Sequence, residues 1–174
     1  MSRMRAGIFA AIAVTLLAIA GILSFQTDLV VSKVEGRIDA PIDLVFEFII
    51  EPDERPKWMQ FVESSVQMSG FPGEKGAQML MMVEQEGYTV GVFEELASVD
   101  EPFSVRYQID EETANVTTTY RLEDAEGGTH LIIETERILK KGWARTFAFF
   151  LRGSSEKYLQ YNFTSLKRLA ENAN

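Results

Sequence analysis

Residues 140–170 read KKGWARTFAFFLRGSSEKYLQYNFTSLKRLA, and this stretch decides the fold. Plotted at about 100° per residue, many of its side chains fall within about 120° of one another, which predicts one face of a long helix. The residues on this face are Trp143, Phe147, Phe150, Leu151, Ser154, Tyr158, Tyr161, Asn162, Ser165 and Leu169. Phe149 and Phe163 fall outside it. We expect the rest of the chain to wrap around this helix.

The expected inner face of the helix is aromatic at its start and small and polar from its middle onward. A helix that only fills a core more often carries Leu, Ile and Val. Buried hydroxyl and amide groups need hydrogen-bond partners, so we interpret the polar half of this face as part of a pocket wall. The aromatic half fits a plain core equally well.

The chain before this helix predicts a sheet. Segments rich in β-branched and aromatic residues alternate with Gly, Pro, Asp and Glu turns, which is typical of strands joined by hairpins. We expect strands at 29–38, 62–68, 77–85, 88–99, 103–109, 115–122 and 129–139, and two short helices at 42–50 and 53–58. Short connections favour antiparallel pairing. The predicted class is α+β, a helix-grip arrangement in which a curved seven-stranded sheet wraps around the C-terminal helix.

Composition excludes several functions. The chain has 174 residues, a formal net charge of −9, one histidine and no cysteine. An acidic body argues against nucleic acid as a partner. Without cysteine, and with a single histidine, neither thiolate catalysis nor a Cys- or His-rich metal site is available, and we expect no metal and no cofactor.

Residues 6–25 contain no charge, follow Arg3 and Arg5, and are long enough to cross a bilayer as a helix. A cleaved signal peptide is the alternative, since Ala18-Ile19-Ala20 offers a small-x-small site. The apolar run continues past that site, so we favour an uncleaved anchor at 1–28 and one ligand-binding domain at 29–174. The flanking arginines place the N-terminus inside, which makes this a single-pass membrane protein with a periplasmic or extracellular domain.

Five short segments, taken in order, resemble one family pattern. They are residues 38–46 (IDAPIDLVF), Pro52 with 56–58 (PKW), 73–76 (GEKG), 127–129 (GGT) and 166–171 (LKRLAE). On these segments the chain resembles the START/Bet v 1-like superfamily, also called SRPBCC, and within it the polyketide cyclase/dehydrase and lipid-transport group. The resemblance implies the helix-grip fold and a cavity for lipids, sterols, quinones or polyketides. It does not imply one activity, because only some members are enzymes.

Strand alternation predicts which side chains face the helix. The inward sets are Val105, Tyr107 and Ile109; Val116, Thr118, Tyr120 and Leu122; and Leu131, Ile133 and Thr135. Met79 and Met81 share one face and Met82 takes the other; flexible methionines suit a core or an adaptable pocket. The predicted ligand-binding residues are Trp143, Phe147, Phe150, Ser154, Tyr158, Tyr161, Tyr107, Tyr120, Met79 and Met81.

Acid–base chemistry has weaker support in the sequence. Glu134 and Glu136 point the same way along one strand, and we interpret them as an outer-face ladder with Arg121. The remaining acids are expected to be solvated, and no inward carboxylate is identified beside a tyrosine.

We therefore expect a membrane-tethered domain that binds a hydrophobic small molecule, such as a lipid, isoprenoid or polyketide, and we favour binding over catalysis. A cyclase/dehydratase-like enzyme and a protein-interaction module with a filled cavity remain as alternatives. The sequence does not indicate an oligomeric state.

Overall fold

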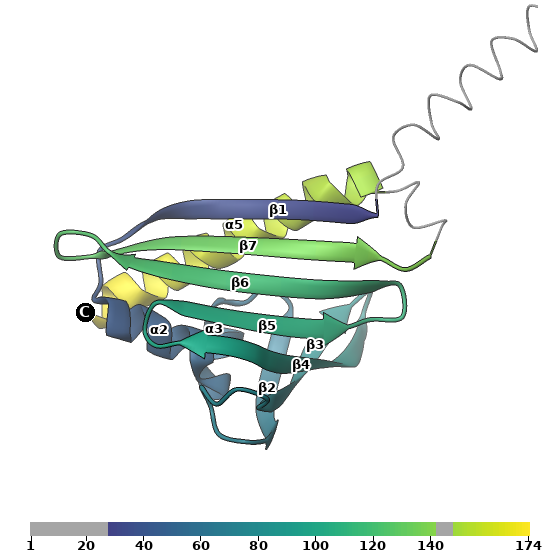
Figure 1. Cartoon of the computed structure of the whole chain (residues 1–174), viewed down its shortest axis with the longest axis horizontal. Helices are drawn as coiled ribbons and strands as arrows, with labels where there is room; N and C mark the ends of the chain where they lie inside the picture. The colour runs from purple at the N-terminus through teal and green to yellow at the C-terminus, as the bar shows by residue number, and fades with distance from the viewer. Residues whose placement is uncertain (1–27, 142–147) are drawn as a thin grey trace, which may run out of the picture.

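The computed structural model describes residues 28–141 and 148–174, and of residues 148–151 it describes the backbone only (Figure 1). The elements follow the chain as one strand, three short helical segments, six strands and a long helix. Their bounds are β1 Leu29–Ile38, α2 Ile42–Ile50, η1 Pro52–Glu54, α3 Arg55–Trp58, β2 Val62–Ser69, β3 Gln78–Gln85, β4 Tyr88–Asp100, β5 Ser104–Asp110, β6 Ala114–Asp124, β7 Thr129–Leu139 and α5 Ala148–Ala173.

The strands form one seven-stranded antiparallel sheet in the order β1-β7-β6-β5-β4-β3-β2. Six of the seven strands follow one another as neighbours, and β1 closes the series by pairing with β7, from Leu29 opposite Ile138 to Ile38 opposite Thr129. The predicted strands and antiparallel pairing are confirmed, with ends that move by one or two residues at most.

Helix α5 crosses one face of the sheet, with α2 and α3 beside its C-terminal half (Figure 1). Polar contacts fix that end of the helix to the junction between β1 and α2. The backbone N–H of Asp39 donates to Glu171 Oε1 at 2.9 Å, and Lys167 Nζ donates to the carbonyl of Arg37 at 2.7 Å. The helix-grip architecture expected from the sequence is therefore present.

The inward sets predicted from alternation are confirmed. Val105, Val116, Leu122, Leu131 and Ile133 are all buried at 5% exposure or less. Met79 and Met81 are buried on the inner face, whereas Met82 is only partly buried on the outer one. On the outer face, Arg121 lies 3.8 Å from Glu134, as the interpretation of a surface ladder requires.

The predicted start of the long helix was wrong. Lys140 and Lys141 are not helical. The backbone N–H of Lys140 donates to the carbonyl of Thr113 at 2.8 Å, and its ammonium group pairs with Asp110. The hydrogen bonding of the sheet thus continues past the end of β7 and holds these residues away from a helical conformation.

The predicted inner face of the helix was only partly right, since Asn162 and Ser165 are buried as expected but other positions are not. Tyr161, expected inside, is 50% exposed, and Phe163, expected outside, is 7% exposed. The buried face runs through Leu159, Phe163, Leu166 and Ala170. Phe163 packs on β1 so closely that a Cβ at Gly36 would come within 2.7 Å of its ring. The prediction took its orientation from the aromatic residues near Trp143, whereas contact with β1 and the short helices decides which side turns inward.

The expected membrane anchor at residues 6–25 lies outside the described residues. Within residues 28–141 and 148–174, none of the helices is both long and apolar enough to cross a membrane.

Candidate functional site

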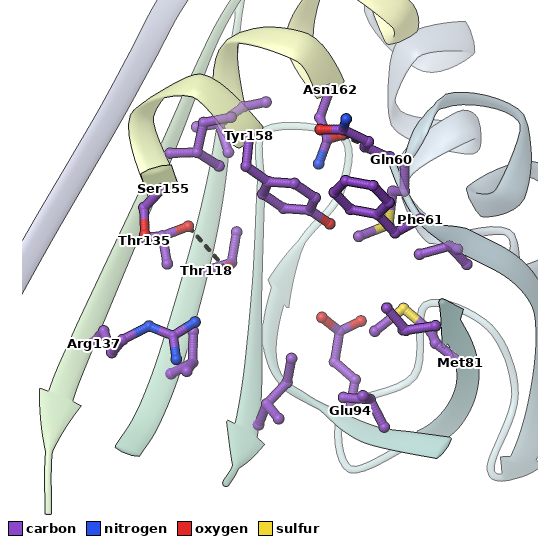
Figure 2. A pocket seen from close by; sticks show the side chains of 18 of the residues that line it. Gln60, Phe61, Met81, Glu94, Thr118, Thr135, Arg137, Ser155, Tyr158 and Asn162 are labelled. Atoms are coloured by element: carbon purple, nitrogen blue, oxygen red, sulfur yellow. Dashed lines mark hydrogen bonds between the residues drawn. The ribbon is translucent and has the colours of Figure 1, made fainter. Parts of the chain in front are cut away.

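Between the sheet and α5 lies a half-open cavity of about 510 Å³ (Figure 2). Side chains from every strand except β1 contribute to its wall, together with the segment that links α3 to β2 and the N-terminal half of α5. Nine of its 22 lining residues are aliphatic or thioether, with Val92, Val116, Ile133, Leu159 and Met81 among them, and three more are aromatic. This is the volume that a curved sheet leaves when one helix covers it.

Polar groups enter the cavity from the helix side. Tyr158 extends from α5 into the space, and Asn162, one turn later, turns toward the segment before β2 (Figure 2). Asn162 is buried and its Oδ1 accepts a hydrogen bond from the backbone N–H of Gln60 at 2.8 Å. That bond fixes the Met59–Phe61 segment against the helix.

A second polar group lies on β6 and β7. The hydroxyls of Thr118 and Thr135 are 3.1 Å apart and hydrogen-bonded across the two strands (Figure 2). Arg137, further along β7, pairs with Glu111 at 2.7 Å. Both members of this ion pair line the cavity and are partly exposed.

The third polar group is a buried ion pair between α3 and β4. Nη1 of Arg55 lies 2.9 Å from Oε2 of Glu94, with side-chain exposures of 0% and 4%. Glu94 lines the cavity, whereas Arg55 lies behind it. The guanidinium is held from the rear, since its Nε donates to the carbonyl of Ile49 at 2.9 Å. Oε2 of Glu94 is therefore buried against the guanidinium.

Three aromatic side chains surround this ion pair. The Arg55 guanidinium lies 4.3 Å from the centroid of the Tyr107 ring, a cation–π contact. Tyr120 meets Tyr107 and Trp58 edge to face, with ring centroids 6.2 and 6.3 Å apart. The Trp58 indole N–H donates to the carbonyl of Phe48 at 2.9 Å, which fixes the cluster to α2.

Burial and charge determine the protonation of these groups. Burial raises the pKa of the Glu94 carboxyl, and the Arg55 guanidinium opposes that shift. Burial acts to lower the pKa of Arg55, but the charge of Glu94 and the neighbouring Tyr107 and Tyr120 together outweigh it and keep Arg55 a cation. Burial also raises the pKa of Tyr107, Tyr120 and Tyr158, so their hydroxyls stay protonated. The cavity therefore holds a compensated ion pair and neutral phenol groups.

The structure brings together only part of the site expected from the sequence. Ser154, Tyr158, Tyr120 and Met81 line the cavity. Met79 and Tyr107 are buried beside Glu94 in a smaller pocket of about 10 Å³. Tyr161 points away from the cavity lining, half exposed. Trp143 and Phe147 lie outside the described residues, as does the side chain of Phe150.

Sequence reasoning missed Arg55 and Glu94. A signal for Glu94 was present, because alternation along β4 places it between Val92 and Leu96 on an otherwise apolar face. The expectation that the remaining acids are solvated was therefore wrong for this residue. For Arg55 no such signal exists, since the segment DERPKW offers two basic residues and only Arg55 is buried.

Residues 30–171 match the family model described as polyketide cyclase/dehydrase and lipid transport. The chain belongs to this family. No protein of curated function matches the chain in sequence. The family resemblance drawn from the five short segments is thereby confirmed, and the family fold accounts for the position of the cavity between sheet and helix.

Solved structures share this fold at low sequence identity. The structure of Ara h 8.0201 is 19% identical, covers 84% of this chain and 99% of its own, and has a TM-score of 0.65. Protein SA2116 from Staphylococcus aureus, whose function is unknown, is 12% identical over 83% of this chain and 95% of its own, at a TM-score of 0.70. The di-domain ARO/CYC protein StfQ from the steffimycin biosynthetic pathway is 14% identical over 83% of this chain, at 0.69, and the match spans 51% of StfQ. At these identities the likeness establishes the fold alone.

Proposed function

We propose that this protein is a membrane-tethered carrier or receptor for a hydrophobic small molecule, which it holds in the cavity between the sheet and α5. The observation that carries the proposal is the cavity itself, at about 510 Å³ within an otherwise packed core. Pockets for small molecules have volumes of this order, mostly apolar walls and a few polar groups that orient the guest. Membership of a family described by lipid transport supports the same function.

The alternative of a filled cavity is less well supported. It requires the protein's own side chains to occupy the space, yet the described residues leave it open between Tyr158 on the helix and Glu94 on the sheet (Figure 2). A cavity filled by the protein's own side chains would also gain no stability from a buried carboxylate in its wall, because burying a charged group is unfavourable.

Native mass spectrometry of residues 28–174 tests the binding function directly. This fragment contains every described element, and the fold makes up 99% of the chain of Ara h 8.0201, so the domain can be studied alone. We expect protein purified without detergent to carry one apolar molecule, or to take one up from a membrane-lipid extract. Organic extraction would identify its class. A clean protein mass with no uptake would favour the interaction module instead.

The tether is a separate part of the proposal and rests on the uncharged run at residues 6–25. A pocket held at a membrane meets apolar molecules where they concentrate. We expect the full chain to sediment with membranes and to resist an alkaline carbonate wash, while residues 28–174 stay in the supernatant. Release of the full chain by the wash, or a mature mass that lacks the first twenty residues, would contradict the anchor.

A second candidate function is proton-transfer catalysis of the cyclase/dehydrase kind. The specific observation is Glu94, an inward carboxylate whose charge adds to the rise that burial causes in the pKa of Tyr107, Tyr120 and Tyr158. StfQ, which shares the fold, is named an ARO/CYC protein. A carboxylate beside phenol groups can accept and return a proton. Conversion of the extracted molecule to an isomer or a dehydrated product on incubation with the protein would favour catalysis over carriage.

A further inference from the structure

The carboxylate of Glu94 is a buried charged group in the cavity wall. Its side chain is 4% exposed, and its Oε2 is buried against Nη1 of Arg55 at 2.9 Å. The cavity begins directly in front of it, and Figure 2 shows the carboxylate extending from β4 into the space. A carboxylate can accept several hydrogen bonds, so the contact of Arg55 with Oε2 leaves acceptor capacity on the side of Glu94 that faces the cavity, where a guest can supply a donor.

We propose, building on the binding function above, that the guest is an uncharged apolar molecule with an alcohol or phenol hydroxyl, and that this hydroxyl donates its hydrogen bond to Glu94. A hydrogen bond to an ionised acceptor is shorter and stronger than one between neutral groups. A guest without a donor would displace solvent from the carboxylate without replacing its hydrogen bond, which lowers affinity.

Charge balance around Glu94 selects a neutral guest. Arg55, 2.9 Å away, already compensates the carboxylate, so an ammonium group would add an unbalanced buried charge. An acid is excluded by the same reasoning, since its carboxylate would face Glu94. The other charges in the described lining, Glu111 and Arg137, neutralise each other at 2.7 Å. No described cation is left over in the lining to hold an acid.

The tyrosine on the opposite wall fits the same guest. Tyr158 extends its phenol from α5 toward the space in front of Glu94 (Figure 2). Burial raises its pKa and a hydrogen bond with the Asn162 side chain opposes that rise, so the hydroxyl stays protonated beside Asn162. A guest hydroxyl can donate to Glu94 and at the same time accept from Tyr158, because an alcohol oxygen is both donor and acceptor. The phenol therefore adds to the cavity wall a second polar group that a guest hydroxyl can use.

The test compares two isomers on the wild-type domain, residues 28–174. 1-Nonanol and 1-methoxyoctane have the same formula and chain length, but only the alcohol has a donor. We expect 1-nonanol to bind about 10-fold more tightly or better, as a hydrogen bond to a charged group implies. Nonanoate should bind at least as weakly as the ether. Affinities would be measured by displacement of a fluorescent apolar reporter, N-phenyl-1-naphthylamine.

A variant then assigns the effect to one carboxylate. In Glu94→Gln the alcohol preference should fall to a few-fold, and nonanoate should become the preferred ligand, since Arg55 then lacks a negative partner. Glu111→Gln removes the other lining carboxylate and serves as the comparison. If Glu94→Gln does not fold, the isomer pair on the wild type still decides the proposal.

The outcomes separate this inference from the binding function beneath it. Equal affinity for the alcohol and the ether would overturn the hydroxyl site and leave cavity binding intact. If the alcohol preference is lost in Glu111→Gln but kept in Glu94→Gln, the carboxylate that accepts the guest's hydrogen bond is not Glu94. Failure of the reporter and of all three ligands to bind would instead count against the binding function itself.

Discussion

Replacing Arg55 with methionine is expected to lower the free energy of unfolding by about 3–5 kcal/mol, because a buried charge loses its partner. Arg55 is fully buried, and its removal leaves Glu94, itself 4% exposed, without a counter-ion. The loss is a large fraction of a typical domain's stability of about 5–15 kcal/mol. Urea unfolding of residues 28–174 followed by tryptophan fluorescence would measure it.

The pH dependence of this loss has a definite sign. Burial already raises the pKa of Glu94 above its ordinary value of 4.5, and removal of Arg55 takes away the group that opposes the shift. A carboxyl whose pKa is raised in the folded state destabilises the fold when it is ionised. The free energy of unfolding therefore falls as pH rises through that pKa. The free energy of unfolding of Arg55→Met should therefore be closer to that of the wild type at about pH 5 than at about pH 8. A loss that is the same at both pH values would indicate a packing effect.

A surface pair provides the matched control. Arg121 and Glu134 lie 3.8 Å apart on the outer face and are both partly exposed. Arg121→Met should change stability by no more than about 1 kcal/mol. The double variant Arg55→Met/Glu94→Gln should cost less than the sum of its two single variants, because each single change leaves one charge unpaired. Strict additivity would contradict the ion pair as described.

The sheet could be predicted because the residue pattern within each strand is enough to place the side chains of that strand. Alternation along 115–122 identifies Val116, Thr118 and Tyr120 as inward without reference to any other strand, and turn residues mark where each strand ends. The structure confirms both. The same local rule, applied to 88–99, would have placed Glu94 inward; the general expectation that an acid is solvated prevented that conclusion.

The helix face and the ion pair depend on tertiary contacts. Helical period fixes which residues of α5 share a face, but Phe163 is buried because β1 has a glycine opposite its ring, and nothing within 140–170 records that fact. Arg55 and Glu94 are far apart in the chain and meet because η1 and α3 fold back toward β4. A single sequence contains both residues but not their pairing, so the cavity and an inward Glu94 could be predicted and the ion pair with Arg55 could not.

Blocking the cavity is expected to have the largest effect on binding. In Thr118→Trp the indole would project from the middle of β6 into the space beside Thr135 (Figure 2). A guest that gives up about 100 Å² of apolar contact loses about 2.5 kcal/mol, or roughly 70-fold in affinity. Because the indole enters an open cavity, the fold should tolerate it better than it would an insertion into a packed core. Displacement of the fluorescent reporter would measure the loss.

The adjacent residue on β6 gives the control for this variant. Thr117 is the same residue type, one position earlier, and its side chain points to the outer face of the sheet opposite Glu136. Thr117→Trp adds the same indole to the same strand and should leave the affinity within about threefold, since it removes no cavity volume. Equal losses in the two variants would mean that the indole acts through the strand and not through the cavity. Full binding in Thr118→Trp would place the guest outside the space between sheet and helix. Only a loss confined to Thr118→Trp is consistent with a guest that lies against β6, within reach of the carboxylate on β4 and the phenol on α5.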